Sequence, residues 1–219
     1  METVIITCLK KARKQGILIR FTLGLKLLLA IAFIPTGAVK LLGRRFTTGV
    51  PEDDSPLLLF EALYQSGVYW QFLGAVQILA GCLLLFYRTS AIGALLFLAI
   101  ASNILFITIS YDFGLTIFVS SGITLASLWL VFWHWDSIRF LFLKNVSNQP
   151  ILLDKPVLKS KVERIVFTTG FLSGLVLFSI LRGLEMPIFM VYISILISVF
   201  CFVFAIILSI IDYMKGAKP

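Results

Sequence analysis

Six long apolar runs, separated by shorter polar segments, dominate the pattern of the chain. They cover about residues 16–43, 70–86, 91–110, 115–133, 165–181 and 188–211. A transmembrane helix needs about 20 consecutive apolar residues, and most of these runs are close to that length. None alternates apolar and polar residues in the way of a membrane β-strand. The pattern therefore predicts an all-α membrane protein with six transmembrane helices.

Two polar intervals divide these spans. Residues 57–66 follow Ser55 and Pro56, which are typical of a helix start, and they predict an amphipathic helix that is too short to cross the membrane and lies at its outer face. A basic interval at 136–163 separates four early spans from two late ones. The predicted units are a basic cytoplasmic N-terminus at 1–19, a four-helix unit at 20–135, a cytoplasmic loop at 136–163, and a C-terminal helical hairpin with a short tail at 164–219.

The positive charges orient the chain. Most of its 19 lysine and arginine residues fall on the side that holds both termini, and only Lys40, Arg44, Arg45 and Arg182 fall on the other side. Cytoplasmic loops carry the excess of basic residues, so both termini are predicted to be cytoplasmic. This bias and the attraction to anionic lipid headgroups explain the net charge of +8, so binding to nucleic acid is not predicted.

Composition narrows the possible chemistry. With 59% hydrophobic residues and a mean hydropathy of +1.02, the chain has no room for a large soluble catalytic domain. One histidine and three separated cysteines provide no metal cluster and no thiol pair, so no metal and no resident cofactor are predicted. His134, between Trp133 and Trp135, is interpreted as an interfacial residue rather than a haem ligand. No aspartate or glutamate lies in the middle of a span, which argues against a proton pump.

Neutral polar residues in four spans share one depth, about 10 Å below the outer boundary at 1.5 Å of helix rise per residue. These ligand-binding candidates are Thr36, Gln77, Asn103, Ser120 and Ser121. One interpretation is that they are interhelical glue. The other is an outward-facing pocket for a polar headgroup with an apolar tail. The candidates for its mouth are Lys40, Arg44, Glu61, Gln65, Tyr111 and Asp112.

The order of several segments resembles the DoxX-like membrane proteins. These segments are FIPTGAVKLLG at the end of the first span, FEALYQSGVYWQFLGAVQILAG, NILFITISYDFG and WLVFWHW, within residues 20–135. The resemblance implies a four-helix bundle in a bacterial cytoplasmic membrane, to which this chain adds two C-terminal spans. It also implies relatives linked to thiosulfate:quinone oxidoreduction, redox-protein maturation or membrane-protein assembly. Gln77 stands where DoxX-like proteins often carry an acidic residue, which argues against an acid/base role.

Three functions remain open on these grounds. The leading hypothesis is a non-catalytic accessory protein that binds a lipophilic ligand, a membrane-protein partner or a second copy of itself. The first alternative is a quinone-interacting subunit of a membrane oxidoreductase whose partner holds the redox centre. The second is a small-solute transport component, which a repeat between the two halves would favour; no such repeat is apparent.

Overall fold

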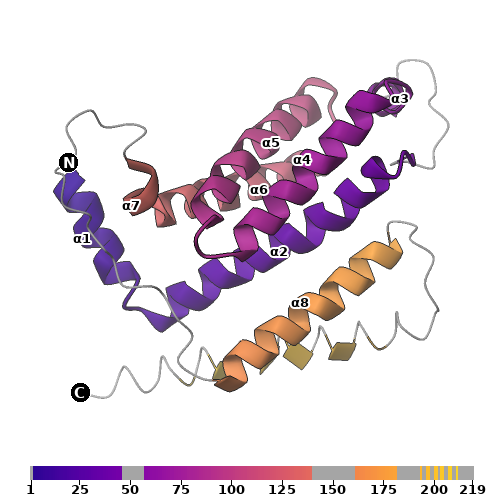
Figure 1. Cartoon of the computed structure of the whole chain (residues 1–219). Coiled ribbons are helices and arrows are strands. Elements are labelled where there is room, and N and C mark those ends of the chain that lie inside the picture. The colour runs from indigo at the N-terminus through magenta and orange to yellow at the C-terminus, as the bar shows by residue number, and fades with distance from the viewer. Residues whose placement is uncertain are drawn as a thin grey trace, which may run out of the picture.

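Helices are the regular elements throughout the described part of the chain (Figure 1). The computed structural model describes residues 2–45, 57–139 and 161–181, and further on Ile193, Leu196, Ile197, Phe200, Cys201, Val203, Phe204, Ile207, Leu208 and Ile211. The elements are α1 (Glu2–Ala12), α2 (Gly16–Leu41), α3 (Leu57–Gln65), α4 (Val68–Leu85), α5 (Ser90–Ser110), α6 (Thr116–Trp133), α7 (Trp135–Ile138) and α8 (Lys161–Leu181).

Five of these helices, α2, α4, α5, α6 and α8, are long and apolar enough to cross a membrane. Helices suit hydrocarbon because they satisfy their backbone hydrogen bonds internally. The chain is therefore a helical, multi-pass membrane protein. The first five predicted spans are confirmed as helices, with starts or ends displaced by a few residues. The sixth, at 188–211, lies largely outside the described residues.

Four of the long helices share one core. Leu29 and Phe33 from α2 meet Leu84 from α4, Phe97 from α5 and Leu130 from α6. The rings of Phe33 and Phe97 lie 4.3 Å apart between their centroids. Successive helices run antiparallel, and α6 returns to α2, where the indole of Trp129 donates a hydrogen bond of 3.0 Å to the Thr22 hydroxyl. The predicted four-helix unit is thus closed by contacts between its first and last helices.

Close backbone contact joins α2 to α4. A Cβ atom placed on Gly37 would lie 2.7 Å from the carbonyl oxygen of Gly74, and one placed on Gly74 would lie 2.5 Å from the carbonyl oxygen of Gly37. Further along, a Cβ on Gly81 would lie 2.7 Å from Ile34. Lipid tails are as apolar as the side chains, so membrane helices associate mainly through such close packing. Because glycine has no side chain, these residues determine how closely the two helices approach.

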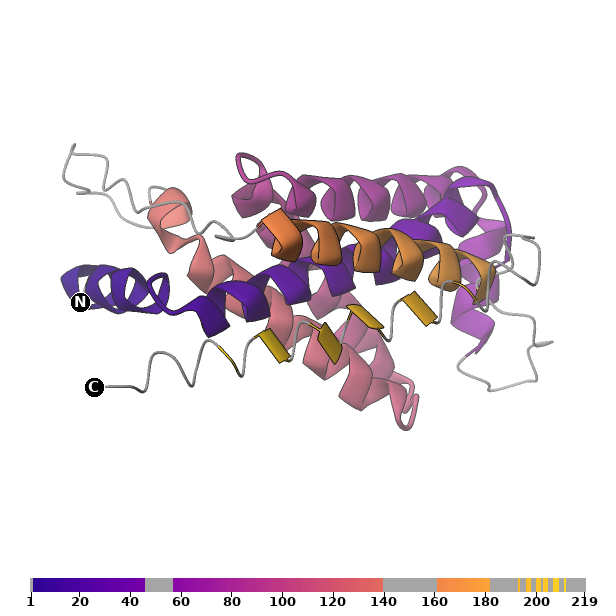
Figure 2. The same cartoon turned by 90° about the horizontal axis from the view of Figure 1, so that it is seen from below.

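Helix α8 lies against α2 on the outside of the bundle, and the two run side by side in Figure 1 and in the perpendicular view of Figure 2. A Cβ on Gly174 would lie 2.7 Å from Ile31. Near the start of both helices, Arg20 forms a buried ion pair of 2.8 Å with Glu163. The two contacts show that α2 and α8 are parallel, because they join residues in the same order along both helices.

Two helix ends are closed by the same backbone motif. After α2, the N–H of Gly43 donates to the Lys40 carbonyl and the N–H of Arg44 donates to the Val39 carbonyl, with Gly43 at a φ of +67°. This is a Schellman motif, and its left-handed position favours glycine. After α5, Asp112 takes the same position at a φ of 47°. Asp112 therefore has a role in ending α5.

Two of the predicted polar segments contain helical residues. The basic N-terminus at 1–19 contains α1, and the interval at 136–163 begins within α7 and ends within α8. Both α1 and α7 lie at the end of α2 opposite α3 (Figure 1). Leu9 and Arg13 are buried, whereas Lys10 and Lys14 are exposed, so α1 has one packed face and one basic face. The sequence alone does not show these two faces, because α1 is short and contains lysines beside its apolar residues. Residues 140–160 lie outside the described part.

The glycine contact predicts opposite effects for two glycines of α2. Gly37→Ala should lower the free energy of unfolding by about 1–3 kcal/mol, because the new Cβ meets backbone atoms that cannot move aside cheaply. The control is Gly24→Ala, where the Cβ meets nothing within 4 Å, so stability should stay the same or rise by up to about 1 kcal/mol. Thermal unfolding in detergent measures both. Equal stability of the two variants would contradict the predicted packing.

Candidate functional site

Gln77 carries a buried acceptor in the contact between α2 and α4. The residue is 6% exposed, and its Cβ lies 3.1 Å from where a Cβ on Gly37 would be. Within the described part of the chain, the side-chain oxygen of Gln77 has no hydrogen-bond partner. A buried amide without a partner costs about 1–3 kcal/mol, so most buried amides in proteins are satisfied.

The other predicted ligand-binding candidates do not converge on Gln77. Thr36 is buried, but its hydroxyl donates back to carbonyls of its own helix, 2.9 Å from that of Ala32. The hydroxyl of Ser120 lies 2.8 Å from that of Thr108, a buried link between α5 and α6. Ser121 donates to a carbonyl one turn back in its own helix, and Asn103 is exposed on α5.

Two mouth candidates at the end of α2 and just after it, Lys40 and Arg44, contact one indole. The ammonium of Lys40, a buried residue, lies 5.0 Å from the centre of the Trp70 ring. The indole N–H of Trp70 donates a hydrogen bond of 2.9 Å to the carbonyl of Arg44. Trp70 itself is buried, although tryptophans at helix ends often face the lipid. These contacts join the end of α2 to the start of α4.

Helix α3 adds a second layer over this indole. The guanidinium of Arg45 lies 5.1 Å from the centre of the Tyr64 ring, and Tyr64 meets Trp70 edge-on with centroids 6.5 Å apart. Arg45 also forms an ion pair of 2.9 Å with Glu61, which accepts a hydrogen bond of 3.3 Å from Gln65. We call this set of residues the α3 cap; it consists of Lys40, Arg44, Arg45, Glu61, Tyr64, Gln65 and Trp70.

The turn between α5 and α6 reaches the same end of the bundle. The ring of Phe113 lies 5.7 Å from that of Phe60 in α3. Tyr111 and Asp112, the two remaining mouth candidates, precede Phe113 and are exposed. The structure therefore gathers Lys40, Arg44, Glu61 and Gln65 in or beside the α3 cap, and leaves Tyr111 and Asp112 on a neighbouring turn.

The opposite end contains a buried basic cluster. Arg13 binds Asp136 through both guanidinium nitrogens, at 2.7 and 3.1 Å. It also donates a hydrogen bond of 2.6 Å to the Trp133 carbonyl and lies 5.8 Å from the centre of the Trp133 ring. Arg13 thus attaches the segment after α1 to the end of α6 and to α7.

His134 directly follows α6 and is packed among neighbouring side chains. It is 3% exposed, its ring centre lies 6.4 Å from that of Tyr87, and its Nε2 atom has no hydrogen-bond partner among the described residues. Burial, followed by the positive charges of Lys26 and Arg13, lowers the pKa of His134 to about 3. Burial also raises the pKa of Tyr87. Both side chains are therefore neutral at physiological pH.

Comparison with other proteins identifies one relative. No family model matches the chain, and no solved structure matches it. The chain is 33% identical over 111 residues to the uncharacterized protein YwoB of Bacillus subtilis (strain 168), and the alignment covers 48% of this chain and 70% of YwoB. This chain belongs to the YwoB family.

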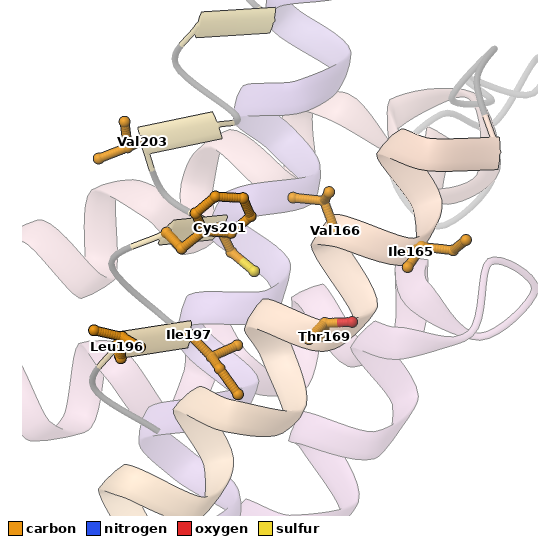
Figure 3. A pocket seen from close by; sticks show the side chains of 8 residues that line it. Ile165, Val166, Thr169, Leu196, Ile197, Cys201 and Val203 are labelled. Atoms are coloured by element: carbon orange, nitrogen blue, oxygen red, sulfur yellow. The ribbon is translucent and has the colours of Figure 1, made fainter. Parts of the chain in front are cut away.

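An apolar groove opens between α8 and the described residues further along this YwoB-family chain. Its volume is about 720 Å³. In Figure 3, Ile165, Val166 and Thr169 of α8 line one side, and residues such as Leu196 and Cys201 line the other. Thr169 is the principal polar side chain here, so the groove suits acyl chains and offers few groups that could recognise a headgroup.

The two polar ends of this YwoB relative therefore differ in chemistry. The α3 cap and Gln77 offer cations, aromatic faces and an amide. The opposite end offers cations and an imidazole. Sequence reasoning missed the role of Arg13 and Asp136, because the contact joins residues 123 apart in the chain. The available signal was the position of two acidic residues, Asp136 and Glu163, at the two ends of a mostly basic interval.

The neutral state of His134 predicts sensitivity to acid. An unfolded histidine has a pKa near 6.5, so between pH 7 and 5 the unfolded chain takes up a proton that folded His134, with a pKa of about 3, does not. Stability is therefore complete above pH 6.5 and falls as the pH decreases. His134 should contribute a loss of about 2 kcal/mol between pH 7 and 5.

The matched variant is His134→Asn, which stays uncharged at every pH. Thermal unfolding in detergent at pH 7 and pH 5 should show a smaller decrease for this variant than for the wild-type chain. Tyr87, whose ring contacts His134, and the positive charges of Lys26 and Arg13 that act on it remain the same in both chains. Identical decreases would mean that folded His134 accepts the proton as readily as unfolded His134.

Proposed function

We propose that this chain is a DoxX-like accessory protein of a bacterial cytoplasmic membrane that binds a lipophilic ligand at the end of the bundle capped by α3. The ligand's polar headgroup meets Gln77, and the protein holds no redox centre of its own. The observation that carries the proposal is the buried, unsatisfied oxygen of Gln77.

An amide that served as interhelical glue would bond to the neighbouring helix. Gln77 faces the backbone contact with Gly37 and finds no partner for its oxygen among the described residues. A buried oxygen without a hydrogen bond is unfavourable, and this cost is removed when a ligand provides the donor. If the side-chain amide rotates by half a turn, its NH2 group can donate to a ligand carbonyl. Gln77 can therefore bind either a hydroxyl or a ketone.

The α3 cap supports a headgroup site beside Gln77. A Cβ on Gly74 would lie 2.9 Å from Cβ of Lys40, and Gly74 precedes Gln77 by one turn of α4. Lys40 thus stands about one turn, and Trp70 about two turns, nearer the membrane surface than the amide. A positive charge and an aromatic face in that place suit a polar or ring-shaped headgroup.

The basic residues support the orientation. Lys10, Lys11 and Lys14 are exposed on or just after α1, and Arg88 is exposed in the turn between α4 and α5, at the end opposite α3. The positive-inside rule then assigns the α1 end to the cytoplasm and the α3 cap to the outer face.

A quinone-interacting subunit is the second candidate, favoured by one observation. The indole of Trp70 lies beside the ammonium of Lys40, and a quinone offers both a flat ring for the indole and carbonyl oxygens for the cation. The electron donor and its redox centre would then belong to a partner. The mass of the bound ligand separates a quinone from a lipid.

The test is native mass spectrometry of the full chain extracted with its surrounding membrane. The wild-type chain should carry a small lipophilic adduct that Gln77→Met loses, because the thioether cannot replace the amide. Asn103→Leu is the matched control: it removes an amide of similar depth on the exposed face of α5 and should keep the adduct. Equal retention in wild type and Gln77→Met would refute the site.

Stability gives an independent reading of the same variant. In adduct-free protein, Gln77→Met should raise the free energy of unfolding by about 1 kcal/mol, because it removes an unsatisfied buried acceptor. A structural amide would behave in the opposite way, so a decrease in the melting temperature with no change in adduct would identify Gln77 as interhelical glue.

A further inference from the structure

We propose that the outward face of α5 around Asn103 binds a second copy of this chain, so that the two copies form a symmetric dimer whose Asn103 amides are hydrogen-bonded to each other. The contact is separate from the headgroup site at Gln77, which lies between α2 and α4, and does not depend on it.

Asn103 places a primary amide on the outside of a membrane-spanning helix. It is exposed, and it lies about 10 Å inside the end of α5 at 1.5 Å of helix rise per residue. Within the described part of the chain, no hydrogen bond joins its side chain to another residue. The hydroxyls of Thr108, Ser121 and Thr124, in contrast, bond to carbonyls of their own helices. An amide without a partner in hydrocarbon costs about 2–7 kcal/mol, so Asn103 favours a partner outside the chain.

The residues on the same side of α5 as Asn103 form a seam along which another helix can pack. Ala99 lies one turn before it and Phe106 one turn after it, and Ile92 and Ser110 continue the line; all are exposed. Positions three, four and seven residues apart share one side of a helix. The small side chain of Ala99 lets a second helix approach closely. The Ser110 hydroxyl already donates to the carbonyl of Phe106, at 2.8 Å, whereas the amide in the middle of the seam is free to bond across it.

The seam is turned away from the helices that surround α5. Helix α5 packs against α4 and α6, whereas α8 packs against α2 on the other side of the bundle (Figure 1). The side chains of Phe106 and Ile92 remain 68% and 56% exposed, although they flank Asn103 in the middle of the span. The face is therefore open to another chain in the membrane.

A second copy matches Asn103 in both depth and chemistry. Copies inserted in one membrane share one orientation, so a two-fold axis along the membrane normal brings the two Asn103 residues together at the same depth. A primary amide has both an NH2 donor and a carbonyl acceptor, so two such amides can donate to each other at once. A different partner would need its own donor and acceptor at this level. A single asparagine in a helix seam also fixes the register of the pair.

Asn103→Leu tests the contact without endangering the fold, because leucine at an exposed position suits hydrocarbon better than an amide does. The full chain is labelled with donor or acceptor fluorophores at the exposed Cys8 and reconstituted in phosphatidylcholine vesicles. Energy transfer between the labels is measured as the protein is diluted with lipid. Thr168→Val is the matched control: it removes an exposed polar group from α8, where the hydroxyl already bonds to the Arg164 carbonyl at 2.8 Å.

The wild-type chain and Thr168→Val should associate equally, and native mass spectrometry of both should show two copies. Asn103→Leu should need about tenfold more protein per lipid to reach the same energy transfer, as expected for the loss of the hydrogen bonds between the amides. Asn103→Gln keeps the amide on a longer stem and should restore most of the association.

Several results would overturn the proposal. They are a wild-type chain that stays monomeric at every dilution, equal energy transfer in wild type and Asn103→Leu, and equal losses in Asn103→Leu and Thr168→Val. A different membrane protein that is bound by the wild-type chain and released by Asn103→Leu would also exclude a second copy as the partner. The two proposals fail separately: Gln77→Met should leave the association unchanged, and Asn103→Leu should keep the adduct at Gln77, which is counted per chain.

Discussion

The close contact of α2 with α4 at Gly37 and Gly74 is the constraint on which the bundle depends, because hydrocarbon surroundings give apolar side chains little reason to prefer each other over lipid. Backbone approach at these glycines brings Ile34 against Gly81 on the next turns and places Leu29, Phe33 and Leu84 in the shared core. It also buries Gln77, whose Cβ meets the surface of Gly37. The same packing that positions the helices therefore places a polar side chain where water is excluded. Burying a polar group there is unfavourable unless it forms a hydrogen bond with the protein or with a ligand.

Polar contacts then decide which helices attach to this pair. Arg20 and Glu163 connect α8 to α2, and Arg13 and Asp136 connect the α1 segment to α7. Buried ion pairs contribute little net stability, because desolvation offsets most of the attraction. Their effect is greater on specificity, since a mispaired helix would leave one charge buried alone. On this argument the parallel arrangement of α2 and α8 is selected by Arg20, and the contact of Gly174 with Ile31 follows from it.

Sequence alone could predict the helices but only part of the candidate site, and Gln77 and Asn103 show why. Counting residues from the end of a span gives the depth of a side chain, which both amides share. It does not give the direction in which the side chain points. Helix α5 is apolar on every side, so its pattern contains no face that marks the core, and Asn103 proves to be exposed whereas Gln77 is buried. Ser120 was predicted to belong to the same polar layer, and its hydroxyl pairs with that of Thr108 on the neighbouring helix. The contact of Arg13 with Asp136 crosses 123 residues and leaves no local pattern at all.

Helix α2 connects the two polar ends, and its residues explain why they differ. At one end Lys40 lies over the ring of Trp70, where aromatic electrons partly replace water around the ammonium. At the other end Lys26 is partly buried on α2, and no carboxylate in the described part of the chain forms an ion pair with it. The two lysines belong to one helix and one chemical type, yet Lys40 lies over an aromatic ring whereas Lys26 has no such ring among the described residues. The difference arises from the neighbouring helices: α4 brings an indole to Lys40, whereas α6 is followed by a buried imidazole that stays neutral.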